Sequence, residues 1–283
     1  MKQVQWFPGH MFKSLREIKE KIKLMDLVFI LLDARVPFSS MNPSILELVG
    51  IKPTLVLFNK SDLADSKLLK PWFKKYEEEG FFTLAISSSS GKNVDKIYEK
   101  CLEILDEKIQ RRKAKGLKVK PIRAMIIGIP NVGKSTLINQ LTKSKATKTA
   151  NTPGVTKSQQ WIKINEQFEL LDTPGVLWPK FDNPIVGLNL AATGAIKDAI
   201  LPIDNVVNHT LRYLFDNYYL RLVRRYGITI KEYDYLTILD QIGKKRGALL
   251  RGNEIDYERV YQVILSDLRN GLLGELTLDR FTS

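Results

Sequence analysis

The sequence predicts an α/β protein with a doubly wound, mostly parallel sheet, followed by a small all-α domain. In the first part of the chain, apolar runs alternate with amphipathic stretches, as in proteins built from successive strand–helix units. Polar residues end these apolar runs, and ligands of parallel sheets bind where strands end. Helical spacing dominates beyond about residue 190. We therefore expect two domains, residues 1–190 and 191–283.

The expected strands are short and mostly apolar. They lie at 27–33, 54–59, 81–87 and 123–129, with a hairpin formed by QWIKI and FELLD (160–164 and 168–172). Amphipathic segments near 42–49, 65–79 and 93–109 are the expected helices. The basic segment KIQRRKAKGLKVKPIR (108–123) is equally consistent with a nucleic-acid contact and with a solvated linker.

The composition indicates a globular protein that attracts polyanions. The 283 residues are 44% hydrophobic and 27% charged, which is ordinary for a chain with a buried core. The net charge of +13 favours nucleic acid as a partner, ahead of an anionic membrane surface. The single cysteine excludes a disulfide framework, and no apolar run approaches the roughly 20 residues of a membrane span. We expect a cytoplasmic protein without a membrane partner.

The strongest motif is GIPNVGKS (128–135), a full G-x-x-x-x-G-K-S between a strand and a helix. In such a loop, backbone N–H groups and the helix N-terminus hold phosphate oxygens. Lys134 is expected to reach the β- and γ-phosphates of a nucleotide, and Ser135 to bind Mg²⁺. Further contacts to the nucleotide are expected from Asn131, Val132, Gly133 and Thr136.

Two more segments complete the phosphate-binding half. In LLDTPG (170–175), Asp172 is expected to hold Mg²⁺ through a water, and the Gly175 amide to face the γ-phosphate. D-x-x-G is a weak pattern alone, but it gains weight at this spacing after a phosphate loop. In NTPGVTKS, Thr156 is the expected additional Mg²⁺ ligand, with Thr152 as the alternative.

The base-reading half is NKSD, residues 59–62. Asp62 is placed to accept hydrogen bonds from N1–H and the 2-amino group of guanine, and adenine offers neither donor. Asn59 is expected to bond the purine edge, and the stem of Lys60 to lie along the base. Ser87 and Ser88, in AISSSSG, are expected to close over the base. GTP and GDP are therefore the expected ligands.

The base-reading motifs precede the phosphate-reading ones, which is the reverse of the usual order. This order predicts a circularly permuted P-loop GTPase domain, because a chain whose termini lie close together can be joined and reopened elsewhere. The loop after Asp172 then leads almost directly into the helical domain. The γ-phosphate is therefore expected to influence that domain.

The permuted order, WFPGHM (6–11), DARVPFSSMNP (33–43) and the C-terminal helices resemble the ribosome biogenesis GTPase A family over essentially the whole chain. The resemblance implies a GTP hydrolase that binds the large ribosomal subunit late in assembly and uses hydrolysis as a switch for association and release. It implies 23S rRNA and ribosomal proteins as partners and stimulation by the subunit. We also expect a monomer.

The residue after D-x-x-G is Val176, which cannot orient water by a hydrogen bond, so catalysis must draw on another residue. The resemblance implies that His10 acts in hydrolysis and that Asn131 coordinates K⁺. From the residues alone, a structural or RNA-contacting role is favoured for His10, whereas Asn131 is equally consistent with an ordinary loop residue. His209, within a helical apolar pattern, is expected in the core or on the surface.

The helical domain carries basic residues that suit rRNA. Interleaved tyrosines are interpreted either as stacking platforms or as core residues. The residues are Arg221, Arg224, Arg225, Lys244, Lys245, Arg246, Arg251, Tyr218, Tyr219 and Tyr226. The alternative function is a GTP-binding RNA module in which hydrolysis is incidental. A tRNA-modifying or membrane-associated GTPase is disfavoured, because neither an added catalytic domain nor an amphipathic anchor is visible.

Overall fold

The structure is a computed structural model that describes residues 9–117, 120–143, 159–198 and 202–281. It divides into two compact units, Met1–Lys180 with Phe281–Ser283, and Phe181–Arg280. The division at 180 precedes the predicted boundary at 190, because helix α7 (Pro184–Ala192) packs against α8 and α10 of the second unit. No helix among the described residues has the length and apolar character needed to span a membrane.

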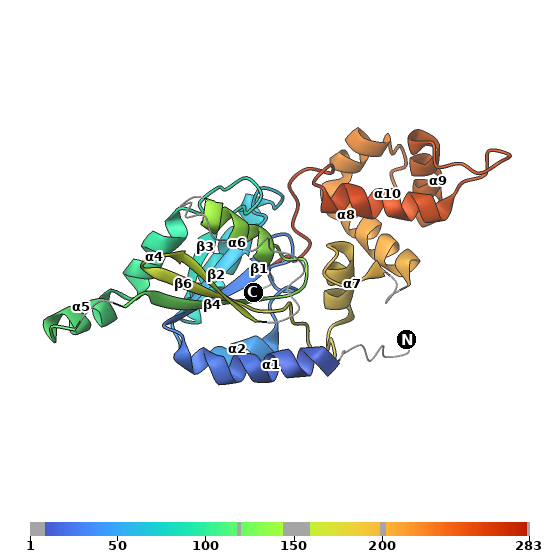
Figure 1. Cartoon of the computed structure of the whole chain (residues 1–283). Coiled ribbons are helices and arrows are strands. Elements are labelled where there is room, and N and C mark those ends of the chain that lie inside the picture. The colour runs from blue at the N-terminus through green and yellow to red at the C-terminus, as the bar shows by residue number, and fades with distance from the viewer. Residues whose placement is uncertain (1–8, 118–119, 144–158, 199–201, 282–283) are drawn as a thin grey trace. The chain divides into compact units, whose positions relative to one another are not determined.

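The first unit is built on one six-stranded sheet with the order β3-β2-β1-β4-β6-β5 (Figure 1). All neighbours are parallel except β5 and β6, which form the predicted antiparallel hairpin at the edge. The strands are β1 (Leu27–Asp33), β2 (Thr54–Asn59), β3 (Phe82–Ala85), β4 (Ile122–Gly128), β5 (Gln160–Asn165) and β6 (Phe168–Asp172). The predicted doubly wound, mostly parallel sheet is therefore confirmed.

Strands β1 and β2 are buried along their whole length. Such burial is expected for parallel strands covered on both faces. In Figure 1, α1 and α2 lie on one side of the sheet, and α4 and α6 on the other. The helices of this unit are α1 (Gly9–Lys21), α2 (Pro43–Val49), α3 (Ser66–Glu78), α4 (Lys96–Ile104), α5 (Asp106–Ala114) and α6 (Lys134–Lys143).

Two helical features differ from expectation. The segment expected as one helix at 93–109 forms α4 and α5, which are separated at Leu105. Helix α1, followed by a 3₁₀ turn at Ile22–Leu24, was not predicted. Its buried residues Met11, Ser14 and Ile18 nevertheless recur at helical spacing, so one stripe of the helix packs against the body.

The sheet order places a topological switch point between β1 and β4. The chain runs outward from β1 to β2 and β3, then returns to the opposite side of β1 as β4. At such a point, the connections leave the carboxyl ends of the two strands in opposite directions, and ligands bind in the resulting crevice. The predicted nucleotide residues therefore belong at the carboxyl ends of these strands.

The regular structure of the second unit is helical among its described residues, as predicted, apart from one isolated β-bridge between Leu249 and Ile255. It consists of α7, α8 (Ile203–Tyr226), α9 (Tyr235–Arg246) and α10 (Tyr257–Arg269). Apolar side chains on their facing sides form its core, including the fully buried Leu211, Leu214, Ile238 and Ile264. The backbone of α8 departs from helical geometry at Tyr218, where two helical segments meet.

Candidate nucleotide site

The carboxyl ends of four neighbouring strands bring the separate motifs together. Asp33 is the register partner of Asn59, and Gly128 is the partner of Leu31 on the other side of β1. Asp172 ends β6, next to β4. The parallel sheet thus gathers motifs that are more than a hundred residues apart in sequence, as the permuted order predicts.

The glycines of the phosphate loop allow close backbone packing. A Cβ atom at Gly128 would lie 2.6 Å from the carbonyl oxygen of Leu31, and one at Gly133 would lie 2.4 Å from Nδ2 of Asn59. Gly133 also has a φ of +103°, which L-residues with side chains rarely adopt. Asn131, at the tip of the loop, has a left-handed φ of 56°. Both motif glycines are therefore required by the shape of the loop.

Lys134 lies within this loop, in a position suited to an anion. Its Nζ donates to the carbonyl oxygens of Gly128 and Ile129, each at 3.0 Å, and the residue is buried. Burial lowers the pKa of Lys134 to about 8, although the neighbouring charge of Asp172 opposes this shift. A phosphate group would stabilise the ammonium in its charged form.

The D-x-x-G segment packs directly on the phosphate loop. A Cβ atom at Gly175 would lie 2.7 Å from the backbone nitrogen of Pro130. Thr173 donates its hydroxyl to the carbonyl oxygen of Ile126 at 2.7 Å, and the amide of Val176 donates to that of Gly128 at 3.1 Å. The side chain of Val176 is fully buried, in agreement with its predicted inability to orient water.

The oxygen donors near Lys134 fit Mg²⁺ together with a phosphate. Ser135 lies in the first turn of α6, and the carboxylate of Asp172 is 5% exposed at the end of β6. The described residues contain no group of three or more His, Cys, Asp or Glu side chains that could hold a metal. Mg²⁺ usually takes one or two protein oxygens and completes its shell with water and substrate phosphate, so this sparse donor set suits it.

Asn59 connects three motifs of the site. Its Nδ2 donates to the carbonyl oxygen of Val132 at 2.8 Å. Its Oδ1 accepts from the backbone amide of Ser88 at 2.9 Å and from the hydroxyl of Ser88 at 2.8 Å. The amide of Asn59 thus bonds within the protein at both ends, a role that was not predicted. Its contact with the purine edge stays a prediction.

The base-reading loop contains a buried carboxylate oxygen that has no hydrogen-bond partner among the described residues. This oxygen is Oδ1 of Asp62. An unpaired buried carboxylate oxygen is costly, so it points to a donor supplied from outside the chain. Ser87 and Ser88 are buried in the adjoining loop, where the Ser87 hydroxyl lies 3.1 Å from that of Ser89.

Asp33 and Arg35, which received no role from the motif pattern, form a charged cluster with Lys60. Arg35 donates through Nε and Nη2 to the two carboxylate oxygens of Asp33, at 2.9 and 2.7 Å. Lys60 donates to Asp33 at 2.8 Å and to the carbonyl oxygen of Asn131 at 3.0 Å. Although burial opposes the shift, Arg35 and Lys60 hold the pKa of Asp33 well below its ordinary value. The sequence signal was an acid and an arginine directly after a buried strand.

Several predicted residues are not tested by this geometry. Thr152 and Thr156 lie outside the described residues, so the choice between them stays open. The backbone of His10 belongs to α1, but its side chain is not described. His209 is half-buried in the helical unit, where its Nε2 lies 2.9 Å from Oδ1 of Asn189, and burial lowers its pKa.

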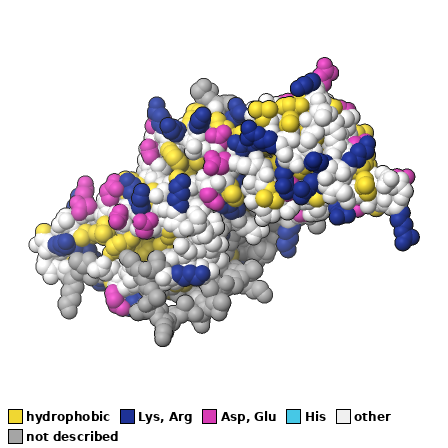
Figure 2. Space-filling model, turned by 90° about the horizontal axis from the view of Figure 1, so that it is seen from above, with side chains coloured by type: hydrophobic (Ala, Val, Ile, Leu, Met, Phe, Trp, Pro, Cys, Tyr) yellow, Lys and Arg dark blue, Asp and Glu magenta, His cyan; other side chains and the backbone are white. Residues whose placement is uncertain are grey.

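The tyrosines of the helical unit are mainly packing residues. Tyr218 and Tyr226 are buried, at 9% and 1% exposure, which excludes them as exposed stacking platforms. The hydroxyl of Tyr219 donates to the carbonyl oxygen of Ile230 at 2.8 Å. Of the predicted basic patch, Arg225 forms an ion pair with Asp267, while the exposed members are Arg224, Lys244, Lys245, Arg246 and Arg251. Figure 2 shows basic side chains scattered among acidic and apolar ones on the face displayed.

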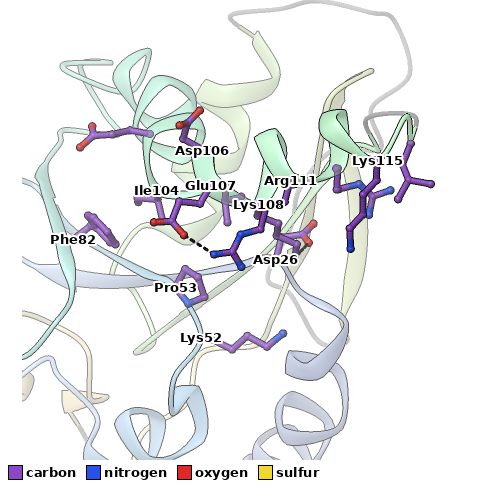
Figure 3. A pocket seen from close by; sticks show the side chains of 14 residues that line it. Asp26, Lys52, Pro53, Phe82, Ile104, Asp106, Glu107, Lys108, Arg111 and Lys115 are labelled. Carbon is purple, nitrogen blue, oxygen red and sulfur yellow. Dashed lines mark hydrogen bonds and ion pairs between the residues drawn. The ribbon is translucent and has the colours of Figure 1, made fainter.

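A separate hollow of about 790 Å³ lies at the amino ends of β1, β2 and β3, away from the nucleotide residues (Figure 3). Helix α5 forms one of its walls. Its charges largely pair within the protein: Lys108 with Asp26 at 2.6 Å, and Arg111 with Glu107 at 3.2 Å. This balance distinguishes the hollow from the anion-binding loop around Lys134.

Comparison with known proteins agrees with this arrangement. Residues 123–242 match a family model described as "50S ribosome-binding GTPase". The chain resembles the crystal structure of GNP-bound YlqF from T. maritima with a TM-score of 0.63 and 25% identity, over 95% of this chain and 98% of that one. This likeness supports the circularly permuted GTPase fold.

Curated relatives extend the match to nearly the full length. A protein of Bacillus licheniformis named ribosome biogenesis GTPase A is 49% identical, over 98% of both chains. A protein of the same name from Bacillus pumilus is 50% identical, also over 98% of both. Because half of all positions agree from one end of the alignment to the other, and the motifs meet at one end of the sheet, the chain belongs to the ribosome biogenesis GTPase A family.

Proposed function

We propose that this GTPase of ribosome biogenesis binds the large ribosomal subunit late in its assembly and hydrolyses GTP there as a switch for association and release. The observation that carries the nucleotide assignment is the buried Oδ1 of Asp62, which has no hydrogen-bond partner in the described part of the chain. Asp62 lies in the unit whose phosphate loop surrounds Lys134. The matched family model, described as "50S ribosome-binding GTPase", and the net charge of +13 support the choice of partner.

Each nucleotide-binding residue has a separate task in this proposal. Asp62 accepts the two guanine donors, while Ser87 and Ser88 close the loop over the base. Lys134 and the N–H groups of residues 131–136 bind the β- and γ-phosphates, and the Gly175 amide faces the γ-phosphate. Mg²⁺, held by Ser135, Asp172 and either Thr156 or Thr152, supplies charge neutralisation when bound.

Orientation of the attacking water falls to residues other than Val176. We assign this task to His10, because a histidine can orient water or accept its proton near neutral pH. Asn131, which is exposed at the tip of the phosphate loop, is assigned as a ligand of K⁺. Both assignments derive from the family resemblance.

Binding to 23S rRNA is assigned to the exposed basic side chains of the helical unit. Arg224, Lys244, Lys245, Arg246 and Arg251 are exposed and supply positive charge that suits the phosphate backbone. Contacts with ribosomal proteins complete the docking, and the protein acts as a monomer.

The test is GTP turnover with and without large subunits, in potassium and in sodium. Turnover should rise on addition of subunits and fall when sodium replaces potassium, while Asn131→Ala should remove the difference between the cations. His10→Ala should retain GTP affinity and subunit binding but lose most of the stimulated hydrolysis. If subunits bind without accelerating turnover, the alternative is correct, and the protein is a GTP-binding RNA module with incidental hydrolysis.

A further inference from the structure

The charged cluster at the end of β1 connects the base-reading and phosphate-reading halves of the site. Asp33 shares its Oδ2 between Nη2 of Arg35 at 2.7 Å and Nζ of Lys60 at 2.8 Å. The same Nζ reaches the carbonyl oxygen of Asn131 at 3.0 Å, in the phosphate loop. A chain of polar contacts therefore runs from Arg35 through Asp33 and Lys60 to Asn131.

Arg35 is the most completely enclosed charge of this cluster. Its side chain is 1% exposed, compared with 3% for Asp33 and 23% for Lys60. Its backbone amide also donates to Oδ1 of Asp33 at 3.1 Å, so one residue fixes the carboxylate through three donors. A planar guanidinium bonded to both oxygens sets the orientation of the carboxylate, which a lysine ammonium cannot do.

The charge of Arg35 is influenced mainly by Asp33 and only weakly by the base-reading acid Asp62. Burial opposes ionisation of Arg35, yet Asp33, and more weakly the charge of Asp62, raise its pKa above the ordinary value. Asp33 has two cationic partners, Arg35 at 2.7 Å and Lys60 at 2.8 Å. Without Arg35, the buried carboxylate of Asp33 would keep only the ammonium of Lys60 to compensate its charge.

The backbone of Lys60 has an unfavourable conformation, so its contact with Asp33 is needed to hold it. Lys60 has a left-handed φ of 60°, which is unfavourable for a residue with a side chain. Asp62 follows two residues later, in the same turn. Any loosening of the contact between Lys60 and Asp33 therefore acts directly on the turn that places the Asp62 carboxylate.

We propose that Arg35 is a positioning residue for guanine selectivity, which acts by holding Asp33 against Lys60 and so fixing the turn that carries Asp62. The inference rests on the proposed guanine contact of Asp62. Arg35 itself touches neither the base nor the reacting phosphate in this assignment. Its removal should therefore affect nucleotide affinity and the discrimination between bases.

The experiment compares binding of GTP and of ITP, which is GTP without the 2-amino group, to wild type, Arg35→Gln and Arg35→Lys. Wild type should prefer GTP by about tenfold, the effect of one hydrogen bond to a charged group. Arg35→Gln should weaken GTP binding by roughly tenfold and reduce the GTP preference to about threefold or less. Arg35→Lys keeps the charge but not the planar guanidinium. Its preference for GTP over ITP should therefore lie between those of wild type and Arg35→Gln.

Arg225→Gln is the matched control. Arg225 forms a bidentate pair with Asp267 at 2.8 Å for both contacts, but in the helical unit. The substitution Arg225→Gln should reduce thermal stability and leave the preference for GTP over ITP unchanged. A loss of preference in this control would mean that lowered stability alone erases selectivity, and the inference would be overturned.

Two further outcomes separate the inference from its premise. If wild type binds GTP and ITP equally, the proposed guanine contact of Asp62 is wrong. If wild type discriminates but Arg35→Gln discriminates equally well, only the role of Arg35 is overturned. Should Arg35→Gln fail to fold, the double variant Asp33→Asn, Arg35→Gln removes both charges of the pair. That double variant is expected to lose selectivity too, and full selectivity in it would refute the inference.

Discussion

Two arginine–aspartate pairs, one in each unit, have almost the same geometry and different surroundings. Arg35 and Asp33 pair through contacts of 2.9 and 2.7 Å, and Arg225 and Asp267 through two contacts of 2.8 Å. The third partner differs. Asp33 also binds Lys60 of the base-reading motif, whereas Asp267 accepts the hydroxyl of Tyr226 at 2.9 Å. The same kind of ion pair therefore contacts the base-reading motif in one unit and joins two helices in the other.

The largest effect is expected from Lys134→Ala, which should impair nucleotide binding by the first unit. Its ammonium would make at least two charge-assisted hydrogen bonds to phosphate, worth about 2.7 kcal/mol or more, so GTP affinity should fall at least ~100-fold. Calorimetric titration with GTP measures the loss. Lys143→Ala, an exposed lysine at the end of the same helix, is the control and should bind as wild type does. Wild-type affinity in Lys134→Ala would refute the phosphate-loop assignment.

The next effect concerns the base rather than the phosphates. Asp62→Asn should weaken GTP binding by roughly 100-fold and improve binding of XTP, because the amide can donate to the 2-oxo group of xanthine. Competition between the two nucleotides on each variant measures the change in preference. Ser61 is the neighbouring control, and Ser61→Ala should keep the preference for GTP. An unchanged preference in Asp62→Asn would remove Asp62 from base recognition.

On the helical side, Arg225→Ala should cost stability and spare nucleotide binding. Breaking a buried pair costs roughly 3–5 kcal/mol, but Arg225 is 24% exposed, so we expect about 2 kcal/mol. Chemical unfolding, followed by helix content, measures the loss, and GTP titration of the folded variant should match wild type. A large loss of GTP affinity would show that the two pairs are not separate in function.

Acid should weaken the helical unit through the same pair. Burial raises the pKa of Asp267, but hydrogen bonds from Arg225 and Tyr226 lower it by more, so the pKa lies below its ordinary value. The folded state therefore binds fewer protons at this site than the unfolded chain. Its stabilisation is present above about pH 4 and is lost as pH falls through the folded-state pKa. Arg225→Ala should lessen this acid dependence in unfolding curves measured across pH.

The contrast between the two pairs also marks what the sequence revealed. The phosphate loop, NKSD and D-x-x-G were recognisable because their residue types and spacing are set by the ligand, and the strands that carry them were apolar throughout. Arg35 was not recognised, because its role depends on a fold that places β1 between β2 and β4. The tyrosines left open by the sequence were decided by packing, since Tyr226 lies in the helical core beside Asp267.

Other features that the sequence did not predict also depend on contacts between distant parts of the chain. The amide of Asn59 has Val132 and Ser88 as partners, and this additional role was not predicted because only the tertiary contact between distant motifs reveals it. Helix α1 was missed because its opening residues were interpreted as a family motif. The domain boundary moved because α7 packs with the helices that follow it, a contact that local spacing does not encode.

The smallest effect is a loss of GTP affinity in the basic pH range, in contrast to the helical unit, which loses stability in acid. Burial lowers the pKa of Lys134 to about 8, so the free protein loses this charge as pH rises through that value. A bound polyphosphate favours the ammonium and raises its pKa, so binding takes up a proton above pH 8. GTP affinity should be constant below about pH 7 and fall by up to tenfold per pH unit above about pH 8. Titrations between pH 6.5 and 9.5 measure this, with guanosine as the control for titration of the base itself. An affinity for GTP that follows the guanosine profile would show that Lys134 stays charged throughout, and that its buried position does not tune phosphate binding.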